Sequence, residues 1–125
     1  MDQEPQDQAV SHLESSIEQR ACEGAEKLMG VTSSKLVTPG DSGYPDRIFW
    51  LPPGKPVLIE FKQLGEDAKK NQKFVHKMLR DLGYEVYVCD NVRDALRIIR
   101  DALIRRGVQC EWNGGWRGCL RHIRG

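Results

Sequence analysis

The sequence predicts an α/β fold in a single domain, with a central mixed β-sheet flanked by helices. Two observations lead to this prediction. The chain has 125 residues, a length at which one domain can bury a sizeable core. Segments with helical periodicity also alternate with short apolar runs, in the order helix, strand, hairpin, helix, strand, helix. This order is typical of a sheet that is covered by helices on both faces.

The folded domain is expected to cover residues 11–106. Residues 1–10 are polar and acidic and are expected to be disordered, and residues 107–125 form a basic extension rich in Trp, Arg and Gly. The first helix is expected from about Ser11 to Met29, because apolar residues recur on one face and Gly30 follows. Its apolar face would consist of Leu13, Ile17, Ala21, Gly24 and Leu28.

Two capping boxes fit the start of this helix. In one, Ser11 would cap the helix with Glu14 three residues later, and in the other Ser15 pairs with Glu18. A short strand is expected next, around Lys35–Val37, followed by a loop. Two further apolar runs, Asp46–Leu51 and Val57–Lys62, are joined by the turn sequence PPGKP, which predicts a hairpin.

The second half of the chain continues with a helix, a strand and a helix. The helix should end near Leu82, before Gly83, and bury Val75, Met78 and Leu79 together with Leu82. A strand is expected at Glu85–Cys89. Asn91 should cap a last helix that runs to about Arg105, with Asp94 three residues after the cap. Its apolar face would hold Val92, Ala95, Leu96, Ile99 and Leu103.

Composition excludes several classes of protein. The formal net charge is +1, and no apolar run approaches the length of about 20 residues that a membrane span needs. The four cysteines form no CxxC pair, which favours reduced thiols in a cytoplasmic protein. No signal peptide, membrane contact or nucleotide cofactor is expected. Any basic surface must be local, because the acids and bases nearly balance.

The most informative stretch lies in the predicted hairpin. Side chains alternate along a strand, so Glu60 and Lys62 should share one face, about 7 Å apart. If the preceding strand pairs with this one, Asp46 can lie across from them. Two carboxylates beside a lysine form a site for a hard cation, because Mg²⁺ prefers oxygen ligands and keeps several waters. A metal bound there would acidify water and stabilise charge on a phosphate.

In their order and spacing, these residues resemble the virus-type replication-repair nuclease (VRR-NUC) domain. The resemblance is carried by Gly43-x-Pro45-Asp46, by Glu60-x-Lys62 and by Gln72 on the following helix, and it extends from about Ser11 to Leu103. This family belongs to the PD-(D/E)xK restriction-endonuclease-like superfamily. The resemblance implies that fold and a DNA repair endonuclease that uses Mg²⁺ or Mn²⁺. It also implies a cytoplasmic location in a bacterium or a phage-infected cell.

The resemblance also implies roles for individual residues. Asp46 and Glu60 would be metal ligands, with the backbone carbonyl of Phe61 as a third ligand. Lys62 would be the catalytic lysine, and Gln72 would orient the active site. The family carries a further glutamate on its first helix, for which Glu14 and Glu18 are both candidates. Glu18 is preferred, because it follows the apolar residue Ile17 and Glu14 already has a role in the Ser11 capping box.

Basic residues on the helix after the site suggest contact with DNA. Lys69, Lys73, Lys77 and Arg80 recur at helical spacing and form one stripe. Such a stripe can also be an ordinary solvated face. Lys35 and Arg47 are further candidates for contact with phosphate. His76, one turn after Gln72, is interpreted as a surface histidine.

The favoured function is that of a metal-dependent DNA endonuclease. One active site cuts one strand, so a homodimer acting on branched DNA, such as a four-way junction, is expected. The interface is expected at Phe49–Leu51 or at Trp112 and Trp116, because large apolar patches are rarely exposed on monomers. The alternative is a non-catalytic nucleic-acid-binding module that retains the nuclease fold.

Overall fold

The computed structural model describes residues 13–107 of the chain. In this range, a four-stranded sheet has the strand order β1-β2-β3-β4 and is accompanied by helices α2, α3 and α4. In chain order the elements are α2 (Glu14–Met29), β1 (Ser33–Lys35), β2 (Arg47–Phe49), β3 (Val57–Phe61), α3 (Lys70–Asp81), β4 (Glu85–Cys89) and α4 (Val92–Arg105). The predicted order of elements is confirmed. The N-terminal residues 1–10 and most of the extension at 107–125 lie outside the described residues.

The sheet is mixed, as predicted. β1, β2 and β3 pair antiparallel, and β2 and β3 form the expected hairpin, with Ile48 opposite Leu58. β3 and β4 pair in parallel, with Glu60 opposite Val88. A parallel pair needs a crossover connection, and α3 supplies it. β3 is therefore a central strand, and all five of its residues are buried.

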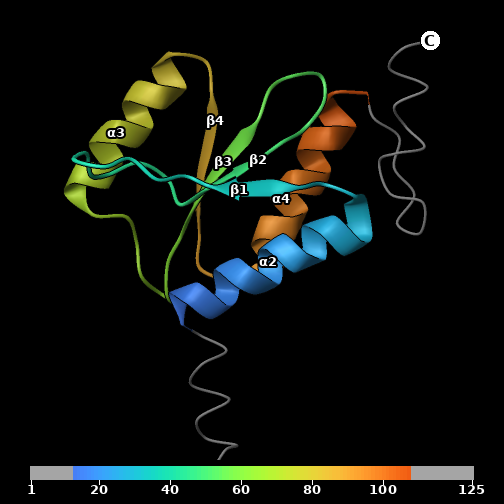
Figure 1. Ribbon diagram of the computed structural model, residues 1–125, viewed down its shortest axis with the longest axis horizontal. Helices are drawn as coiled ribbons and strands as arrows, with labels where there is room; N and C mark the ends of the chain where they lie inside the picture. Colours follow the sequence, from blue (N-terminus) through green and yellow to red (C-terminus); the bar gives the residue numbers. More distant parts are fainter. Residues whose placement is uncertain (1–12, 108–125) are drawn as a thin grey trace, which may run out of the picture.

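The helices form layers on both faces of the sheet. Figure 1 shows α3 on one side of the sheet and α2 and α4 on the other. Phe49, Ile59 and Phe61 point toward α2 and α4, where they pack in a core with Ile99 and Leu103. Leu58 points the other way and packs with Leu79 of α3 and Val86 of β4. The alternation predicted for β3 is therefore confirmed, and it places Glu60 on the α3 side.

The start of α2 differs from the prediction. The helix begins at Glu14, and its N-cap is Leu13, which has extended backbone and no side-chain cap. The predicted capping box of Ser11 and Glu14 is wrong, because Glu14 is the first residue of the helix and not its third. The box of Ser15 and Glu18 is wrong too, because both residues lie inside the helix. The side chain of Glu14 is therefore free to point elsewhere.

The buried face of α2 is also rotated from its predicted position. Ile17 and Ala21 are buried as expected, but Leu13 and Leu28 are exposed. The helix instead buries Ala25 and Met29, together with Glu18. β1 likewise lies two residues before its predicted position, because Ser33–Lys35 pairs with Arg47–Phe49.

The α3 and α4 helices follow the predicted ranges. Asn91 caps α4 through a hydrogen bond that its side chain accepts from the backbone N–H of Asp94 (2.8 Å), as predicted. The buried face of α3 differs, because Met78 and Leu82 are exposed while His76 is buried. The face of α3 that packs toward the sheet carries Gln72, His76 and Leu79. Its N-terminal part is therefore polar, and its C-terminal part is apolar. No helix in residues 13–107 meets the length and apolarity that a membrane span requires.

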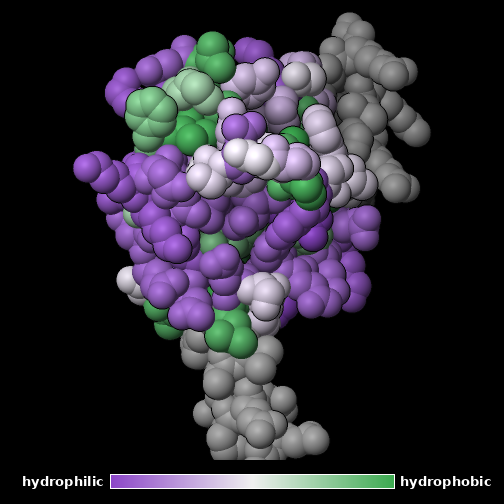
Figure 2. All heavy atoms as spheres, turned by 60° about the vertical axis from the view of Figure 1, so that its left-hand side comes forward, coloured by the Kyte–Doolittle hydropathy of each residue, from purple (hydrophilic) through white to green (hydrophobic). Residues whose placement is uncertain are grey.

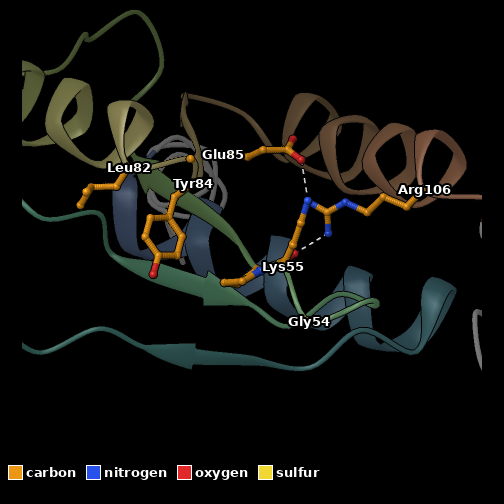
Figure 3. Close-up of a pocket in the computed structure, with 8 residues that line it drawn as sticks. Gly54, Lys55, Leu82, Tyr84, Glu85 and Arg106 are labelled. Atoms are coloured by element: carbon orange, nitrogen blue, oxygen red, sulfur yellow. Dashed lines mark hydrogen bonds and ion pairs between the residues drawn. The ribbon is translucent and has the colours of Figure 1, made fainter.

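A cluster of ion pairs lies at the start of β4, at the other end of the β3–β4 pair from Glu60. Figure 3 shows the part of it formed by Glu85, Arg106 and Lys55. Glu85, at the start of β4, accepts hydrogen bonds from Arg105 (3.0 Å) and Arg106 (2.5 Å), and Tyr87 donates to it at 2.8 Å. Arg106 also donates to the backbone carbonyl of Lys55 in the hairpin loop. Burial opposes the charge of Glu85, but these donors outweigh burial and lower its pKa to about 2. The cluster ties α4 and the hairpin loop to β4.

Candidate active site

The two carboxylates predicted from the hairpin lie together in the structure. Asp46 directly precedes β2, and its Oδ2 accepts a hydrogen bond of 2.8 Å from the backbone N–H of Phe61 on β3. Glu60 is the neighbouring residue on β3 and is 2% exposed. Hairpin pairing, with Arg47 opposite Ile59, is what brings these residues to one place. The juxtaposition that alternation along the strand predicted is confirmed.

Glu14, not Glu18, completes the acidic cluster. Glu14, Asp46 and Glu60 each offer one carboxylate oxygen, and these oxygens lie within 4.8 Å of one another. Glu18 lies one turn further along α2, where its carboxylate pairs with Lys35 (2.9 Å) and Arg47 (2.7 Å). The preference for Glu18 depends on its position after Ile17 and on a capping role for Glu14; Ile17 is buried as expected, but the structure shows no such capping role.

Burial, together with neighbouring carboxylates, raises the pKa of all three carboxyl groups. Burial raises the pKa of Glu60, and the charge of Asp46 raises it further, to about 7, although Lys62 opposes this. The pKa of Asp46 is raised mainly by burial, against the hydrogen bond from Phe61. Burial and then Asp46 raise the pKa of Glu14. Carboxyl groups crowded in this way gain from a cation that neutralises them.

Lys62 and Gln72 contact the same carboxylate. The Lys62 Nζ lies 3.6 Å from Oε2 of Glu60, and its side chain is 7% exposed. The Nε2 of Gln72 donates to the same oxygen at 3.0 Å, while its Oε1 accepts from the backbone N–H of Lys69 at 2.8 Å. The amide of Gln72 is thus oriented by the start of α3. Lys62 lies beside Glu60, as alternation along the strand predicted, and Gln72 lies beside Glu60 as the resemblance implied.

His76 is not the surface histidine that the sequence suggested. It is 1% exposed, and its Nε2 lies 4.0 Å from Oε1 of Glu60. Burial lowers the pKa of His76, and the charges of Arg80 and Lys62 lower it further. His76 follows Gln72 by four residues, a spacing that puts both side chains on one helix face. This spacing is the sequence signal for its burial, because Gln72 is itself a predicted residue of the site.

The predicted basic residues are partly engaged in other contacts. Lys73 pairs with Asp67 (3.2 Å) and Lys77 pairs with Asp81 (2.9 Å), and all four side chains are well exposed. Arg80 donates to the backbone carbonyl of Val86 at 3.0 and 2.7 Å. Lys69 is the exposed N-cap residue of α3. Figure 2 brings the α3 side of the molecule forward and shows that hydrophilic residues cover most of this face.

Gly43 lies in the loop that carries Asp46, and its backbone packs closely against helix α3. Its backbone φ of +96° is a value that residues with a side chain rarely adopt. A Cβ at this position would lie 2.8 Å from Cγ2 of Val75 and 2.9 Å from the backbone oxygen of Asn71. Asn71 also donates from its side chain to the hydroxyl of Ser42 at 3.2 Å. Glycine is thus required here both by backbone conformation and by close approach.

Comparisons with known proteins agree with this geometry. The model of the VRR-NUC domain family matches residues 5–93. The chain is 38% identical over 78 residues to "Putative nuclease p44" of Acyrthosiphon pisum secondary endosymbiont phage 1, a match that covers 62% of this chain and 83% of that protein. A solved structure titled "VRR_NUC domain" superposes with a TM-score of 0.60 at 29% identity, covering 74% of this chain and 94% of the other.

The α/β fold with its mixed sheet is that of the restriction-endonuclease-like class, and the family model and the phage relative support a nuclease. Within that class, the chain belongs to the VRR-NUC family.

Proposed function

We propose that this nuclease is a metal-dependent endonuclease that hydrolyses phosphodiester bonds in DNA with Mg²⁺ or Mn²⁺. The observation that carries the proposal is the convergence of Glu14, Asp46 and Glu60, whose oxygens lie within 4.8 Å of one another. These carboxylates come from a helix, a loop and a strand that are distant in sequence. Such convergence beside Lys62 and Gln72 supports catalysis at this place.

The donor set fits a hard divalent cation. All three side chains offer carboxylate oxygens, which Mg²⁺ and Mn²⁺ accept as ligands. Oε1 of Glu60 is buried and has no hydrogen-bond partner within residues 13–107. Asp46, Glu60 and Glu14 would hold the ion, with the Phe61 carbonyl as a further predicted ligand. When bound, the cation would lower the pKa of water and neutralise charge on the scissile phosphate.

The protein groups around the cluster have separate roles in this proposal. Gln72 fixes one oxygen of Glu60, so that the carboxylate is oriented before substrate arrives. Lys62 places a positive charge 3.6 Å from that oxygen. This charge is suited to stabilising the negative charge that develops on the phosphate during attack.

A cleavage panel tests the proposal. Single-stranded, duplex, flapped and four-way DNA would be incubated with Mg²⁺, with Mn²⁺ or with EDTA, and the products and the bound fraction would be measured. Cleavage that requires metal supports the endonuclease. DNA binding without cleavage in either metal would instead show a non-catalytic binding module that retains the nuclease fold.

The structure predicts a clear difference between the two helix glutamates. Glu14→Gln should reduce single-turnover cleavage by about 100-fold or more, because it removes a carboxylate from the cluster, while stability is maintained. Glu18→Gln should cost about 1–2 kcal/mol of stability, because Lys35 and Arg47 lose their charged partner. Urea unfolding separates the two effects. If stably folded Glu18→Gln lost more activity than Glu14→Gln, the preference for Glu18 would be correct.

We propose that DNA lies along the α3 side, contacting Lys69, Lys73 and Lys77, with Lys35 and Arg47 as further contacts. The ion pairs of Lys73 and Lys77 are exposed, and exposed ion pairs cost little to break. Replacing Lys69, Lys73 and Lys77 with glutamine should weaken DNA binding and reduce the salt slope by about 2 to 3, since each lysine would neutralise one phosphate. The double variant Arg20→Gln/Lys27→Gln on α2 is the control. An unchanged slope in the triple variant would make α3 an ordinary solvated face.

We further propose that the nuclease acts as a homodimer on branched DNA, such as a four-way junction. Phe49 and Leu51 are buried, so they cannot form the predicted interface, but Trp50 is 47% exposed. Trp112 and Trp116 lie outside the described residues. Trp50 lines an apolar groove between α3 and the β1–β2 part of the sheet; its other walls include Leu36, Ile48, Leu58, Leu82 and Tyr84. A second copy of the chain would bury this face and bring two active sites to one DNA molecule.

The groove predicts how the dimer can be disrupted. Trp50→Glu/Leu82→Glu should halve the mass measured by light scattering at micromolar concentration, because charges would be buried at the interface. Phe74→Glu, on an exposed part of α3 outside the groove, is the control and should keep the dimeric mass. A monomeric mass for the unmodified protein would refute the dimer itself.

A further inference from the structure

A buried histidine on α3 faces Glu60 of the acidic cluster. His76 lies on α3, one turn after Gln72, with 1% of its surface exposed. Its Nε2 is 4.0 Å from Oε1 of Glu60, and neither atom has a hydrogen-bond partner within the described part of the chain. The other carboxylate oxygen, Oε2, is already held by Gln72. The two oxygens of Glu60 thus face two residues of one helix, and one of the two contacts is incomplete.

Leaving two buried polar atoms without partners is unfavourable. Each such atom destabilises the folded protein when it is removed from water without a hydrogen bond. A separation of 4.0 Å exceeds a hydrogen bond of about 3.0 Å by about 1 Å, which a small rotation of either side chain can close. Catalytic contacts are often long before the site is loaded and shorten afterwards. The geometry fits a hydrogen bond between His76 and Glu60 that forms once the active site is loaded.

The two unpartnered atoms can satisfy each other as donor and acceptor. A neutral imidazole carries one N–H, and the carboxylate oxygen beside Nε2 can only accept when it is ionised. The proton on Nε2 is therefore the arrangement that satisfies both atoms.

We propose that His76 is a positioning residue of the active site, whose Nε2–H donates to Oε1 of Glu60 and, with Gln72 on Oε2, fixes the carboxylate facing Asp46 and Glu14. The proposal rests on the metal-dependent function proposed above. Each carboxylate oxygen has two lone pairs, so a hydrogen bond from the protein leaves one for a cation. Clamping both oxygens would fix the plane of the carboxylate, as outer partners of metal ligands do in other sites.

Metal binding without DNA tests this role. Mn²⁺ affinity would be measured by calorimetry at pH 8 for the wild type, His76→Leu, His76→Gln and His76→Asn. His76→Leu removes the donor, and His76→Asn is too short to reach Glu60, so both should bind Mn²⁺ about 10- to 100-fold more weakly. His76→Gln can place an N–H near the position of Nε2, and its affinity should stay within a few fold of the wild type. Phe74→Leu, exposed on the same helix, is the matched control.

The comparison of variants distinguishes positioning from packing. Equal affinity in all variants, or equal loss in His76→Gln and His76→Asn, would overturn the proposal. If His76→Leu fails to fold, the comparison of His76→Gln with His76→Asn still decides. If the wild-type protein itself binds no Mn²⁺, the proposed metal dependence fails and the role of His76 fails with it. Normal wild-type binding that no variant changes would refute the role of His76 alone.

Discussion

Glu60→Gln is expected to abolish cleavage and, at the same time, to stabilise the metal-free protein at pH 8. Glutamine keeps the shape of the side chain and can still accept from Gln72, but it removes a ligand charge. Losing several kcal/mol of transition-state stabilisation corresponds to a loss in rate of about 1,000-fold or more. The gain in stability follows from the pKa of Glu60, which burial and then Asp46 raise to about 7.

The sign of this stability effect can be derived from the proton balance. Between the ordinary pKa of 4.5 and the folded value of about 7, the folded protein binds a proton that the unfolded chain releases. Stability of the metal-free protein should therefore fall as pH rises through this range, and stay reduced above it. The shift corresponds to about 3 kcal/mol. The Glu60→Gln variant should not show this pH-dependent loss of stability, because glutamine does not titrate.

Chemical unfolding in EDTA at several pH values between 5 and 8 measures the effect. The wild type and Glu60→Gln should diverge as pH rises, and added Mn²⁺ should restore stability to the wild type alone. Phe74→Leu serves as the control, because it is far more exposed and carries no charge. Parallel stability curves for the wild type and Glu60→Gln, or near-native cleavage by the variant, would refute the role assigned to Glu60.

The second large effect is expected from Lys62→Met. Methionine keeps most of the side-chain length and apolar packing but removes the charge beside Glu60. Cleavage should fall by about 100- to 10,000-fold, because a buried charge that stabilises the transition state is lost. Mn²⁺ should still bind, since Lys62 is not a ligand and its removal takes a positive charge away from the site.

Metal binding is best compared at pH 8.5. Lys62 opposes the rise in the pKa of Glu60, so its loss would increase competition by protons at lower pH. Lys62→Arg is the companion variant, because it keeps the charge with a different shape and geometry. If Lys62→Met lost metal affinity and excess metal alone restored cleavage, Lys62 would act on the ion and not on the reaction.

Much of this site could be predicted from the sequence because strands have a period of two. Once Val57–Phe61 is identified as a strand, the side chain of Glu60 must face away from Ile59 and Phe61. The hairpin then brings Asp46 to the same place, because the turn fixes which residues pair. Gln72 could be placed through the resemblance to the family. These contacts depend on local geometry and hairpin pairing, which the sequence specifies strongly.

The helix glutamate could not be assigned in the same way. Glu14 and Glu18 are four residues apart and lie on one face of α2, so periodicity cannot separate them. What separates them is the position at which α2 crosses the sheet, and this depends on packing by residues such as Ala25 and Met29. The N-cap at Leu13 has no side-chain signal in the sequence. The spacing of His76 from Gln72 is a signal for its burial, whereas its position 4.0 Å from Glu60 depends on how α3 packs against the sheet.

The close approach at Gly43 makes the two halves of the active site one mechanical unit. Asp46 belongs to the loop, while Gln72 and His76 belong to α3, and the missing side chain of Gly43 allows these parts to touch. A single methyl group at this position would push the helix and the loop apart without altering any reacting group. The activity of such a nuclease could thus be reduced by substituting Gly43, with every ionisable residue of the site left unchanged.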